Sequence, residues 1–495
     1  MSPFLQLGGS DGRLIAQPLR MCNRHGLIAG ATGTGKTVTL QVLAEGFANA
    51  GVPVFAADIK GDLSGVAMAA AASPAIEERL AQMPGLEWQP ASVPVVFWDI
   101  FSDRGHPLRT TISEMGPLLL ASLLDLNDNQ LAALYSIFAW ADQQGLLLLD
   151  MKDLNALMAW LLRHPQELNS VSAGTSTASI QAIQRRLVIL QQQGAERLFG
   201  EPALQLADLM QRDLFGRAHI HLLEAGKLIQ ESPRVYASFL LWLLSELYEQ
   251  LPEQGDADKP RLVLFFDEAH LLFDRTPKVL HERIEQVVRL IRSKGVGVFL
   301  VTQSPSDVPD AVLAQLGLRI QHALRAYTPK EQKALRAVAD GFRSNPAFDT
   351  REVLTELAVG EALVSVLDEK GRPSVVERTL MAPPRSRIGI LSEAERTALF
   401  QASPLAGRYE RGIDRESAYE ILAQRAEQAA KQAQAEQEQE QTNKASSRTG
   451  RKGAQEKSFT DGVINTTVRS AVQTLARQIG RELARGLLGS LTGRK

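Results

Sequence analysis

Hydrophobic and polar positions follow a strand–helix rhythm near the beginning of the chain. Up to about residue 105, short apolar runs bounded by Gly, Pro or Asp alternate with a longer segment of helical period. The runs at 25–29, 52–57 and 93–99 predict strands, and 37–50 predicts a helix. Strands that alternate with helices are typical of a parallel sheet with helices on both faces. We therefore predict an α/β fold whose sheet starts here.

Between about residues 113 and 203 this rhythm stops. Segments rich in Leu, Ala and Gln follow one another with almost no strand pattern, and they predict helices at 129–141, 151–163 and 179–193. Such a block inside a sheet domain indicates an all-helical insertion.

Strand-like runs return after the insertion, so the sheet resumes. We expect further strands at 218–223, 262–266, 296–301, 319–324, 362–367 and 374–378. Helices are expected between them at 234–250, 279–294 and 330–339. Residues 1–112 and 204–385 are therefore predicted to form one core, and residues 113–203 the helical insertion between its two halves.

The pattern decays after Pro383-Pro384. Residues 386–458 are Ala-, Glu- and Gln-rich or polar and predict a helical, low-complexity linker. Residues 459–495 predict a basic amphipathic helical tail with one apolar stripe, formed by Ile464, Val468, Val472, Leu475, Ile479, Leu483 and Leu487. A helix of this kind can dock on its own protein, lie on an anionic membrane or follow a phosphate backbone.

Composition narrows the class of protein. The 495 residues are 44% hydrophobic and 22% charged, which excludes a wholly disordered or collagen-like chain. A single cysteine, Cys22, excludes an intramolecular disulfide and a cysteine-based metal cage. The start has no signal-peptide pattern, and no apolar run reaches the ~18 residues of a membrane span, so we expect a cytoplasmic protein.

Charge is distributed unevenly along the chain. The net charge is −2, but residues 443–495 hold 11 Lys and Arg against 3 Asp and Glu. The acidic body argues against a wholly basic nucleic-acid coat protein, and the basic tail leaves room for a local anionic partner.

The most informative motif is GATGTGKT, formed by Gly30, Ala31, Thr32, Gly33, Thr34, Gly35, Lys36 and Thr37. It follows a predicted strand and opens a predicted helix, so its backbone N–H groups can cradle phosphate oxygens at a positive helix N-terminus. Lys36 would reach the β- and γ-phosphates, and the Thr37 hydroxyl would bind Mg²⁺. The alternative is a glycine-rich turn without a ligand.

Two more strands end in polar residues suited to phosphate chemistry. The apolar run before Asp267 and Glu268 predicts a buried strand whose first acid meets the Mg²⁺ shell, while Glu268 polarises the attacking water. Gln303 ends another buried strand, where an amide can sense the γ-phosphate. His219 and His221 share one strand face, but no third metal ligand lies nearby in the sequence, which disfavours a metal site there.

The segments GATGTGKT, ADIKGDLSG, LVLFFDEAH and GVGVFLVTQSP together resemble the HerA/FtsK superfamily of P-loop ATPases, closest to the bacterial helicase HerA-like proteins. The resemblance spans roughly residues 4–385. It implies a P-loop NTPase sheet of the RecA-like class, with residues 30–37 as the nucleotide loop. It also implies Asp267 as the metal-side acid, Glu268 as the catalytic base and Gln303 as the sensor. HerA proper carries a small β-barrel before its P-loop, which we do not expect where the loop starts at residue 30.

The resemblance further implies ATP and Mg²⁺ as ligands and a homo-oligomeric ring, usually a hexamer. In such rings an arginine from one subunit completes the neighbour's site, and the candidates here are Arg292, Arg319 and Arg325. The leading hypothesis is a Mg²⁺-dependent ATPase that moves on DNA. The alternative is a nucleotide-gated scaffold that recruits a protein partner or a membrane without movement along DNA.

Overall fold

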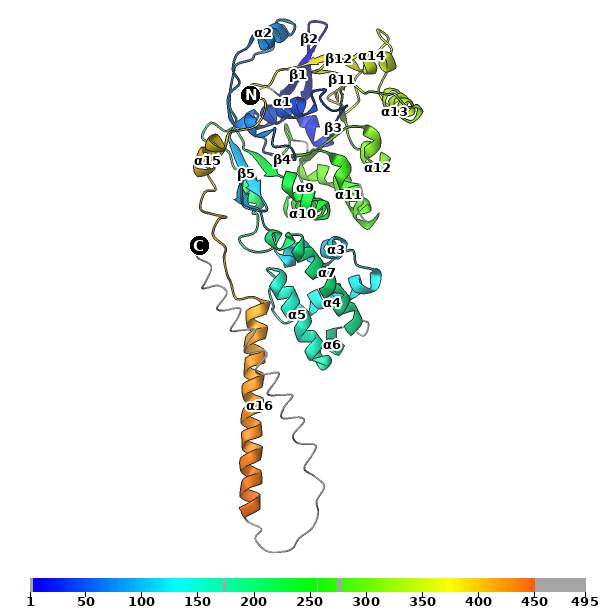
Figure 1. Ribbon diagram of the computed structural model, residues 1–495. Helices are drawn as coiled ribbons and strands as arrows, with labels where there is room; N and C mark the ends of the chain where they lie inside the picture. Colours follow the sequence, from blue (N-terminus) through cyan, green and yellow to red (C-terminus); the bar gives the residue numbers. More distant parts are fainter. Residues whose placement is uncertain (1–2, 172–174, 256, 274–277, 450–495) are drawn as a thin grey trace. The chain divides into compact units, whose positions relative to one another are not determined.

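The computed structural model describes residues 3–171, 175–255, 257–273 and 278–449. Its first compact unit, Met1–Ala423, is built around a twelve-stranded sheet (Figure 1) of order β2-β1-β12-β11-β10-β3-β9-β8-β4-β7-β5-β6. The strands are β1 (Phe4–Ser10), β2 (Arg13–Pro18), β3 (Gly26–Ala29), β4 (Val54–Asp58), β5 (Val95–Asp99), β6 (His106–Pro107), β7 (Ile220–Glu224), β8 (Leu262–Phe266), β9 (Val296–Thr302), β10 (Leu318–Gln321), β11 (Glu361–Ser365) and β12 (Glu377–Met381).

Helices are interspersed with these strands and continue after them. They are α1 (Lys36–Asn49), α2 (Pro74–Ala81), α3 (Ile112–Leu123), α4 (Asp128–Gln143), α5 (Met151–Arg163), α6 (Pro165–Val171), α7 (Thr177–Gln192), α8 (Leu206–Leu209), α9 (Gly226–Glu231), α10 (Pro233–Gln250), α11 (Lys278–Ile291), α12 (Asp310–Leu313), α13 (Pro329–Asp340), α14 (Thr350–Glu356), α15 (Glu393–Gln401) and α16 (Ala418–Thr449).

The strands from β10 to β6 in the sheet order all run parallel, which confirms the predicted mostly parallel α/β fold. Alternate residues of these strands enter two separate cores, because both faces of the sheet are covered. In β8, Leu264 packs with one core and Val263 with the other. The core that holds Val263 contains the apolar face of α1, while the core that holds Leu264 contains α10 and α11.

The remaining four strands, in the order β2-β1-β12-β11, pair antiparallel along one side of the sheet. The sequence analysis did not predict all of these strands. The hairpin of β1 and β2 turns at Asp11 and Gly12, whose φ angles are 48° and 73°. Gly8 faces β12 so closely that a Cβ atom there would lie 2.1 Å from the Leu380 carbonyl oxygen. The prediction of a strand at 374–378 was wrong in position, since β12 begins at Glu377.

Helices α3–α7 occupy the region of the predicted helical block, and α5 has the predicted bounds. Side chains at its helix starts explain why these helices begin where they do: Thr111, Asn127 and Asp150 each form a capping box. The apolar faces of these helices join the same core as α10 and α11, so the block is packed onto one face of the sheet. The exact domain limits given above stay a prediction.

The second compact unit is Gln424–Lys495. Its described residues continue α16, a polar helix rich in Gln, Glu and Ala. The predicted tail at 459–495 lies outside the described residues. Among the helices that the structure describes, none combines the length and the apolar character needed to cross a membrane.

Candidate functional site

Four neighbouring parallel strands, β3, β9, β8 and β4, end at the same edge of the sheet. Ala29 of β3 pairs with Thr302 of β9, and Phe266 of β8 pairs with Leu300 of β9. The loops that follow these strands therefore begin side by side, although they come from distant regions of the chain. Such an edge is the usual place for a ligand site in an open α/β sheet.

The loop after β3 comprises residues 30–35 and leads directly into α1. Gly33 and Gly35 have φ angles of 78° and 112°, a region that strongly favours glycine. At Gly30 a Cβ atom would lie 2.5 Å from the Cβ of His322, so only glycine allows this packing. The Thr34 hydroxyl donates to the Ala31 carbonyl at 2.8 Å, and Thr32 and Gly33 are exposed at the tip of the loop.

Lys36 and Thr37 form the first turn of α1. The Lys36 ammonium donates to the carbonyl oxygens of Gly30 and Ala31 at 2.7 and 3.1 Å, which holds its charge over the loop. Burial lowers the pKa of Lys36, and the carboxylate of Glu268 acts against that shift. The structure thus brings the predicted cation, the glycine loop and the helix N-terminus together.

Asp267 and Glu268 follow β8 directly. Burial and the neighbouring Glu268 raise the pKa of Asp267 to about 6. Glu268 has a φ angle of 45°, a left-handed conformation that is uncommon for a residue with a side chain. Two carboxylates are therefore held next to each other at the sheet edge, an arrangement that a bound cation would stabilise.

The carboxylate of Glu268 is held from three directions. Lys60 Nζ lies 3.3 Å from Oε1, Gln303 Nε2 donates to Oε2 at 3.4 Å, and His270 Nδ1 lies 3.5 Å from Oε2. Burial lowers the pKa of Lys60, but Glu268 and Asp267 outweigh burial, and the pKa is raised overall. Gln303 thus meets the predicted catalytic pair, and Lys60 joins it as a residue that the sequence analysis did not assign.

Lys60 is presented by a hydrogen-bonded turn after β4. The Asp58 carboxylate accepts hydrogen bonds from the backbone N–H groups of Gly61 at 2.7 Å and Leu63 at 3.1 Å. Burial, followed by the charges of Asp62 and Glu224, raises the pKa of Asp58 to about 8. Asp58 therefore shapes the turn that carries Lys60.

A cavity of about 400 Å³ opens beside the start of α1. It is lined by Gly35, Val38, Thr39, Ala70, Ala71, Ala75, Ile76, Arg79, Val359, Gly360, Met381, Ala382, Pro383, Pro384, Ser386, Arg387 and Ile388. The Arg79 guanidinium closes one side, donating to the carbonyls of Gly360 at 3.1 Å and Met381 at 3.0 Å. The cavity is mostly apolar and adjoins the phosphate-type loop.

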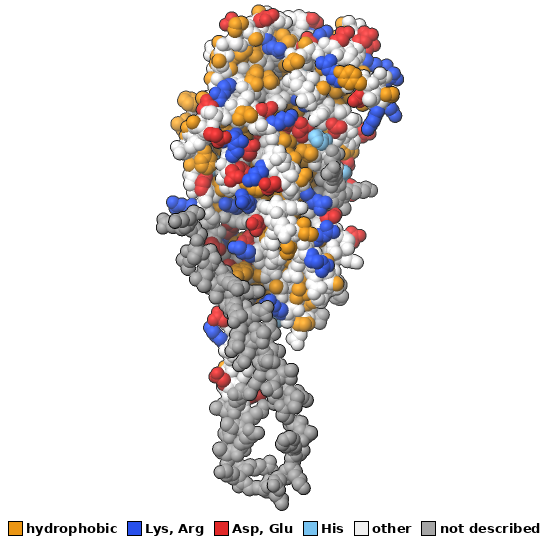
Figure 2. Space-filling view, viewed as in Figure 1, with side chains coloured by type: hydrophobic (Ala, Val, Ile, Leu, Met, Phe, Trp, Pro, Cys, Tyr) orange, Lys and Arg blue, Asp and Glu red, His pale blue; other side chains and the backbone are white. Residues whose placement is uncertain are grey.

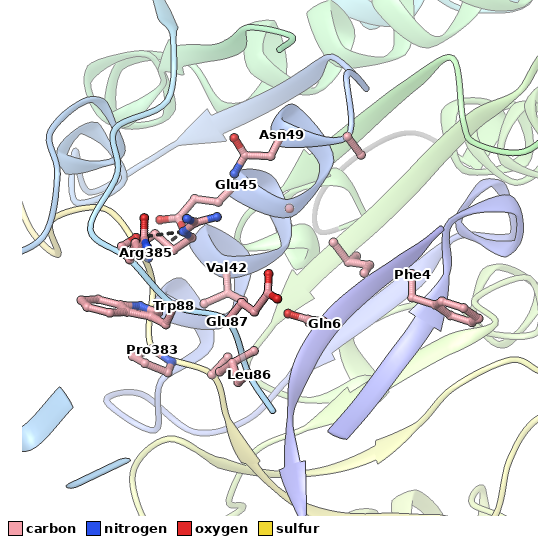
Figure 3. Close-up of a pocket in the computed structure, with 15 residues that line it drawn as sticks. Phe4, Gln6, Val42, Glu45, Asn49, Leu86, Glu87, Trp88, Pro383 and Arg385 are labelled. Atoms are coloured by element: carbon pink, nitrogen blue, oxygen red, sulfur yellow. Dashed lines mark hydrogen bonds between the residues drawn. The ribbon is translucent and has the colours of Figure 1, made fainter. Parts of the chain in front are cut away.

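A larger cavity, of about 820 Å³, lies at the other end of α1 beside Asn49 and Ala50 (Figure 3). The part of α1 from Val42 to Asn49 lines this cavity, and Ala382 and Pro383 line both cavities. Within it, buried Glu45 accepts a hydrogen bond from the backbone N–H of Arg385 at 2.8 Å. That contact ties the chain segment that follows Pro384 to α1.

The three candidate arginines have different surroundings. Arg292 lies in a short 3-10 helix before β9, at the ends of the parallel strands opposite to those that carry the glycine loop. Arg319 lies within β10 and donates to the carbonyls of Gly341 at 3.3 Å and Leu313 at 3.4 Å. Arg325 is exposed and follows the end of β10, on the same sheet edge as the glycine loop.

Each of the paired histidines contacts a neighbouring group. His221 is buried and accepts a hydrogen bond from Trp98 Nε1 at 3.1 Å, while His219 Nδ1 lies 3.2 Å from the Gln211 carbonyl oxygen. No group of three or more His, Cys, Asp or Glu side chains that could hold a metal ion occurs among the residues that the structure describes.

Sequence reasoning missed the residues that support the site from distant loops. Lys60 stands two residues after a buried strand end, a signal that the pattern offered. For Arg79 and His322 the sequence offered no such signal, because they join the loop or its adjoining cavity only through tertiary contacts. His322 Nε2 lies 2.9 Å from the Thr39 hydroxyl, and Nδ1 lies 2.8 Å from the Glu361 carbonyl oxygen.

Comparisons with known proteins show similar folds. A bacterial conjugative coupling protein, TrwB lacking its first 70 residues, has a similar fold, with a TM-score of 0.52 at 13% identity, over 79% of this chain and 92% of that chain. TrwB in complex with a non-hydrolysable GTP analogue gives a TM-score of 0.50 at 13% identity, over 79% of this chain and 99% of that chain.

Sequence comparison adds one curated relative. The probable helicase MJECL08 of Methanocaldococcus jannaschii is 30% identical over 143 residues, which is 27% of this chain and 26% of that protein. The match thus spans about a quarter of the relative's length. The family described as helicase HerA-like C-terminal matches residues 5–495. The chain therefore belongs to the helicase HerA-like C-terminal family.

Proposed function

We propose that this protein is a Mg²⁺-dependent ATPase that works as an oligomeric ring, a hexamer by family resemblance, and couples turnover to movement on DNA in the cytoplasm. One observation carries the proposal: the glycine loop with Lys36, the Asp267–Glu268 pair and Gln303 meet at one sheet edge. The family match supports a nucleotide-driven motor, and the description of one relative as a probable helicase supports DNA as the track.

The nucleotide would bind with its phosphates in the loop of residues 30–37. Lys36 supplies the positive charge for the β- and γ-phosphates, because its ammonium lies over the loop. The base and ribose would occupy the adjoining cavity, which has a volume of about 400 Å³ and a mostly apolar lining.

The oxygen atoms at the site suit a magnesium ion. The Thr37 hydroxyl and the Asp267 carboxylate are hard donors, and Asp267 is a buried acid beside a second acid. Mg²⁺ commonly takes one or two protein ligands and completes its shell with phosphates and water, so no larger ligand cluster is required. Bound there, the ion would neutralise charge on the phosphate oxygens.

In the proposed hydrolysis, each of the remaining polar residues has a separate role. Glu268 accepts the proton of the attacking water, whose oxygen bonds to the γ-phosphorus while the bond to the ADP oxygen breaks. Gln303 donates to Glu268, and in this proposal its amide would orient that water. Lys60 and His270 keep the Glu268 carboxylate in place.

The first test is Glu268→Gln, which keeps the side chain's shape and removes the base. We expect unchanged ATP binding and turnover reduced by at least ~10²-fold, the usual scale of general-base loss. Glu249→Gln, an exposed change on α10, is the matched control and should leave turnover unchanged. Loss of ATP binding with the fold intact would show that Glu268 is structural.

DNA as the track is tested on the wild type in the same assay. Addition of DNA should stimulate turnover of a motor that moves on DNA. Turnover that is indifferent to DNA would favour the alternative, a nucleotide-gated scaffold that recruits a protein partner or a membrane.

A further inference from the structure

Helix α13 has a strongly basic outer face. The helix contains three Lys and Arg against two acids, and Arg325 and Arg343 flank it, in a chain whose net charge is −2. Lys330, Lys333 and Arg336 recur every three residues, and all three are exposed. Figure 2 shows Lys and Arg side chains gathered where Figure 1 has α13. We call these three residues the α13 basic strip.

The strip faces away from the protein because the opposite side of the helix is anchored. Leu335 and Ala339 are buried and belong to a small core that also contains Leu354 of α14. At 100° per residue, Lys330 and Lys333 point to the side opposite these two, and the exposed Arg336 lies between the two sides. The helix is therefore held at a fixed orientation with its cations in solvent.

The acids close to the strip are already engaged by other groups. Glu331 accepts hydrogen bonds from Thr328 and from the Tyr327 backbone N–H, at the N-terminus of the helix. Asp340, at its C-terminal end, is paired with Arg351 at 2.7 Å. Within the described ranges of the chain, no carboxylate forms an ion pair with a member of the strip. The cations thus keep their charge available for an external anion.

The strip is connected to the nucleotide loop by a short backbone path. The backbone N–H of Ala31, in the loop, donates to the Ala323 carbonyl at 2.9 Å, and the N–H of His322 donates to the Ala29 carbonyl at 2.7 Å. From Ala323 the chain reaches the first residue of α13, Pro329, within six residues. The strip and the glycine loop are thereby joined through the segment 322–329.

We propose that the α13 basic strip binds the phosphate backbone of DNA, and that it is one of the surfaces through which this protein holds its track. This inference rests on the proposed function, because the partner is the DNA proposed there. Three cations spaced along one helix face match a polyanion with regularly spaced charges. Tyr327, with 83% of its surface exposed just before the helix, adds an aromatic face on which a base can stack.

The test is the full-length triple variant Lys330→Gln, Lys333→Gln and Arg336→Gln, measured for binding to a fluorescent DNA duplex at several salt concentrations. The plot of log affinity against log salt should become shallower by about 0.9 for each phosphate that is no longer neutralised, close to 3 for all three. A matched triple variant, Lys152→Gln, Arg163→Gln and Arg185→Gln, removes the same charge from exposed positions on α5 and α7 and should keep the wild-type slope.

Further measurements separate this inference from the proposed function. ATP turnover without DNA should be unchanged in the strip variant, because none of its residues lies in the proposed catalytic machinery. A wild-type salt slope in that variant would overturn the strip while leaving a DNA-stimulated wild-type ATPase standing. Loss of binding to phosphatidylserine vesicles with DNA binding intact would overturn it in favour of a membrane. Absence of ATPase activity in the wild type would instead overturn the proposed function.

Discussion

At the scale of single residues, the site combines charges that are costly to bring together. Asp58, Asp267 and Glu268 lie at neighbouring strand ends, and the pKa values of the two aspartates are raised to about 8 and about 6. Lys36 and Lys60 offset the negative charge of these acids, but the cost of burying the acids away from water remains. Such a cluster of acids is expected at a site where a bound cation and a triphosphate complete the balance of charge.

The variant Asp267→Asn tests this balance through the stability of the protein. Asp267 has a pKa near 3.9 when unfolded and about 6 when folded, so the folded state prefers the proton. Its contribution to the free energy of unfolding therefore falls as pH rises from ~4 to ~6 and stays low above that. At pH 8 without Mg²⁺, Asp267→Asn should raise the free energy of unfolding by on the order of 1–3 kcal/mol.

Denaturation measured by circular dichroism at pH 8 and pH 5 checks this expectation. The gain from Asp267→Asn should shrink at pH 5, where the wild-type acid is largely protonated, and the exposed Asp142→Asn should show no gain at either pH. A destabilised Asp267→Asn protein at pH 8 would contradict the account of a buried, unfavourable charge.

At the scale of elements, periodicity predicted the buried strands and the long helices. The strand at 262–266 and the helix at 151–163 have the predicted bounds, because their apolar patterns end at charged or capping residues. The hairpin of β1 and β2 was missed although Asp11-Gly12 is a strong hairpin signal. Helix α2 was missed because it is only 8 residues long and buries none of them, so its apolar pattern is short.

The candidate site, like the elements, was predictable where residues follow buried strands and not where they meet through distant contacts. The glycine loop, the two acids and Gln303 stand at strand ends, where sequence order alone fixes their common edge. Arg79 could not be predicted, since it meets residues 281 and 302 positions away through its hydrogen bonds to Gly360 and Met381. Long-range contacts of this kind leave no periodic trace in the sequence.

Helix α2 provides a test of the cavity beside the loop. No α2 residue is buried, so the Arg79 hydrogen bonds are an important attachment of this helix to the segments at 359–360 and 381. Arg79→Ala should loosen this side of the cavity and raise the KM for ATP about tenfold, equivalent to ~1.4 kcal/mol, with little change in kcat. Glu78 is exposed on the same helix, so the control variant Glu78→Ala should leave both constants unchanged. An unchanged KM in Arg79→Ala would exclude the cavity as the site of the base.

At the scale of the whole molecule, the proposed ring requires a residue that reaches a neighbouring site. Arg319 is engaged by two backbone carbonyls within its own subunit, which favours a structural role. Arg325 is exposed on the sheet edge that carries the nucleotide loop. Of the three candidates, Arg325 is therefore the one we propose as the arginine supplied to the neighbour, and Arg292 remains the second candidate.

Mixing two inactive variants tests this proposal. Arg325→Ala should reduce turnover ~10³-fold or more with ATP affinity nearly intact, the usual scale for an arginine supplied in trans. In an equal mixture with Glu268→Gln, a site works where an Arg325→Ala subunit supplies Glu268 and its Glu268→Gln neighbour supplies Arg325. Random assembly of a head-to-tail ring gives such pairs at about a quarter of the sites, so about a quarter of wild-type turnover should return.

A mixture of Lys36→Ala with Glu268→Gln is the control and should stay inactive, because each site takes both Lys36 and Glu268 from the same subunit. Inactivity of the first mixture, with mixed rings demonstrated by mass, would exclude Arg325 as the shared residue.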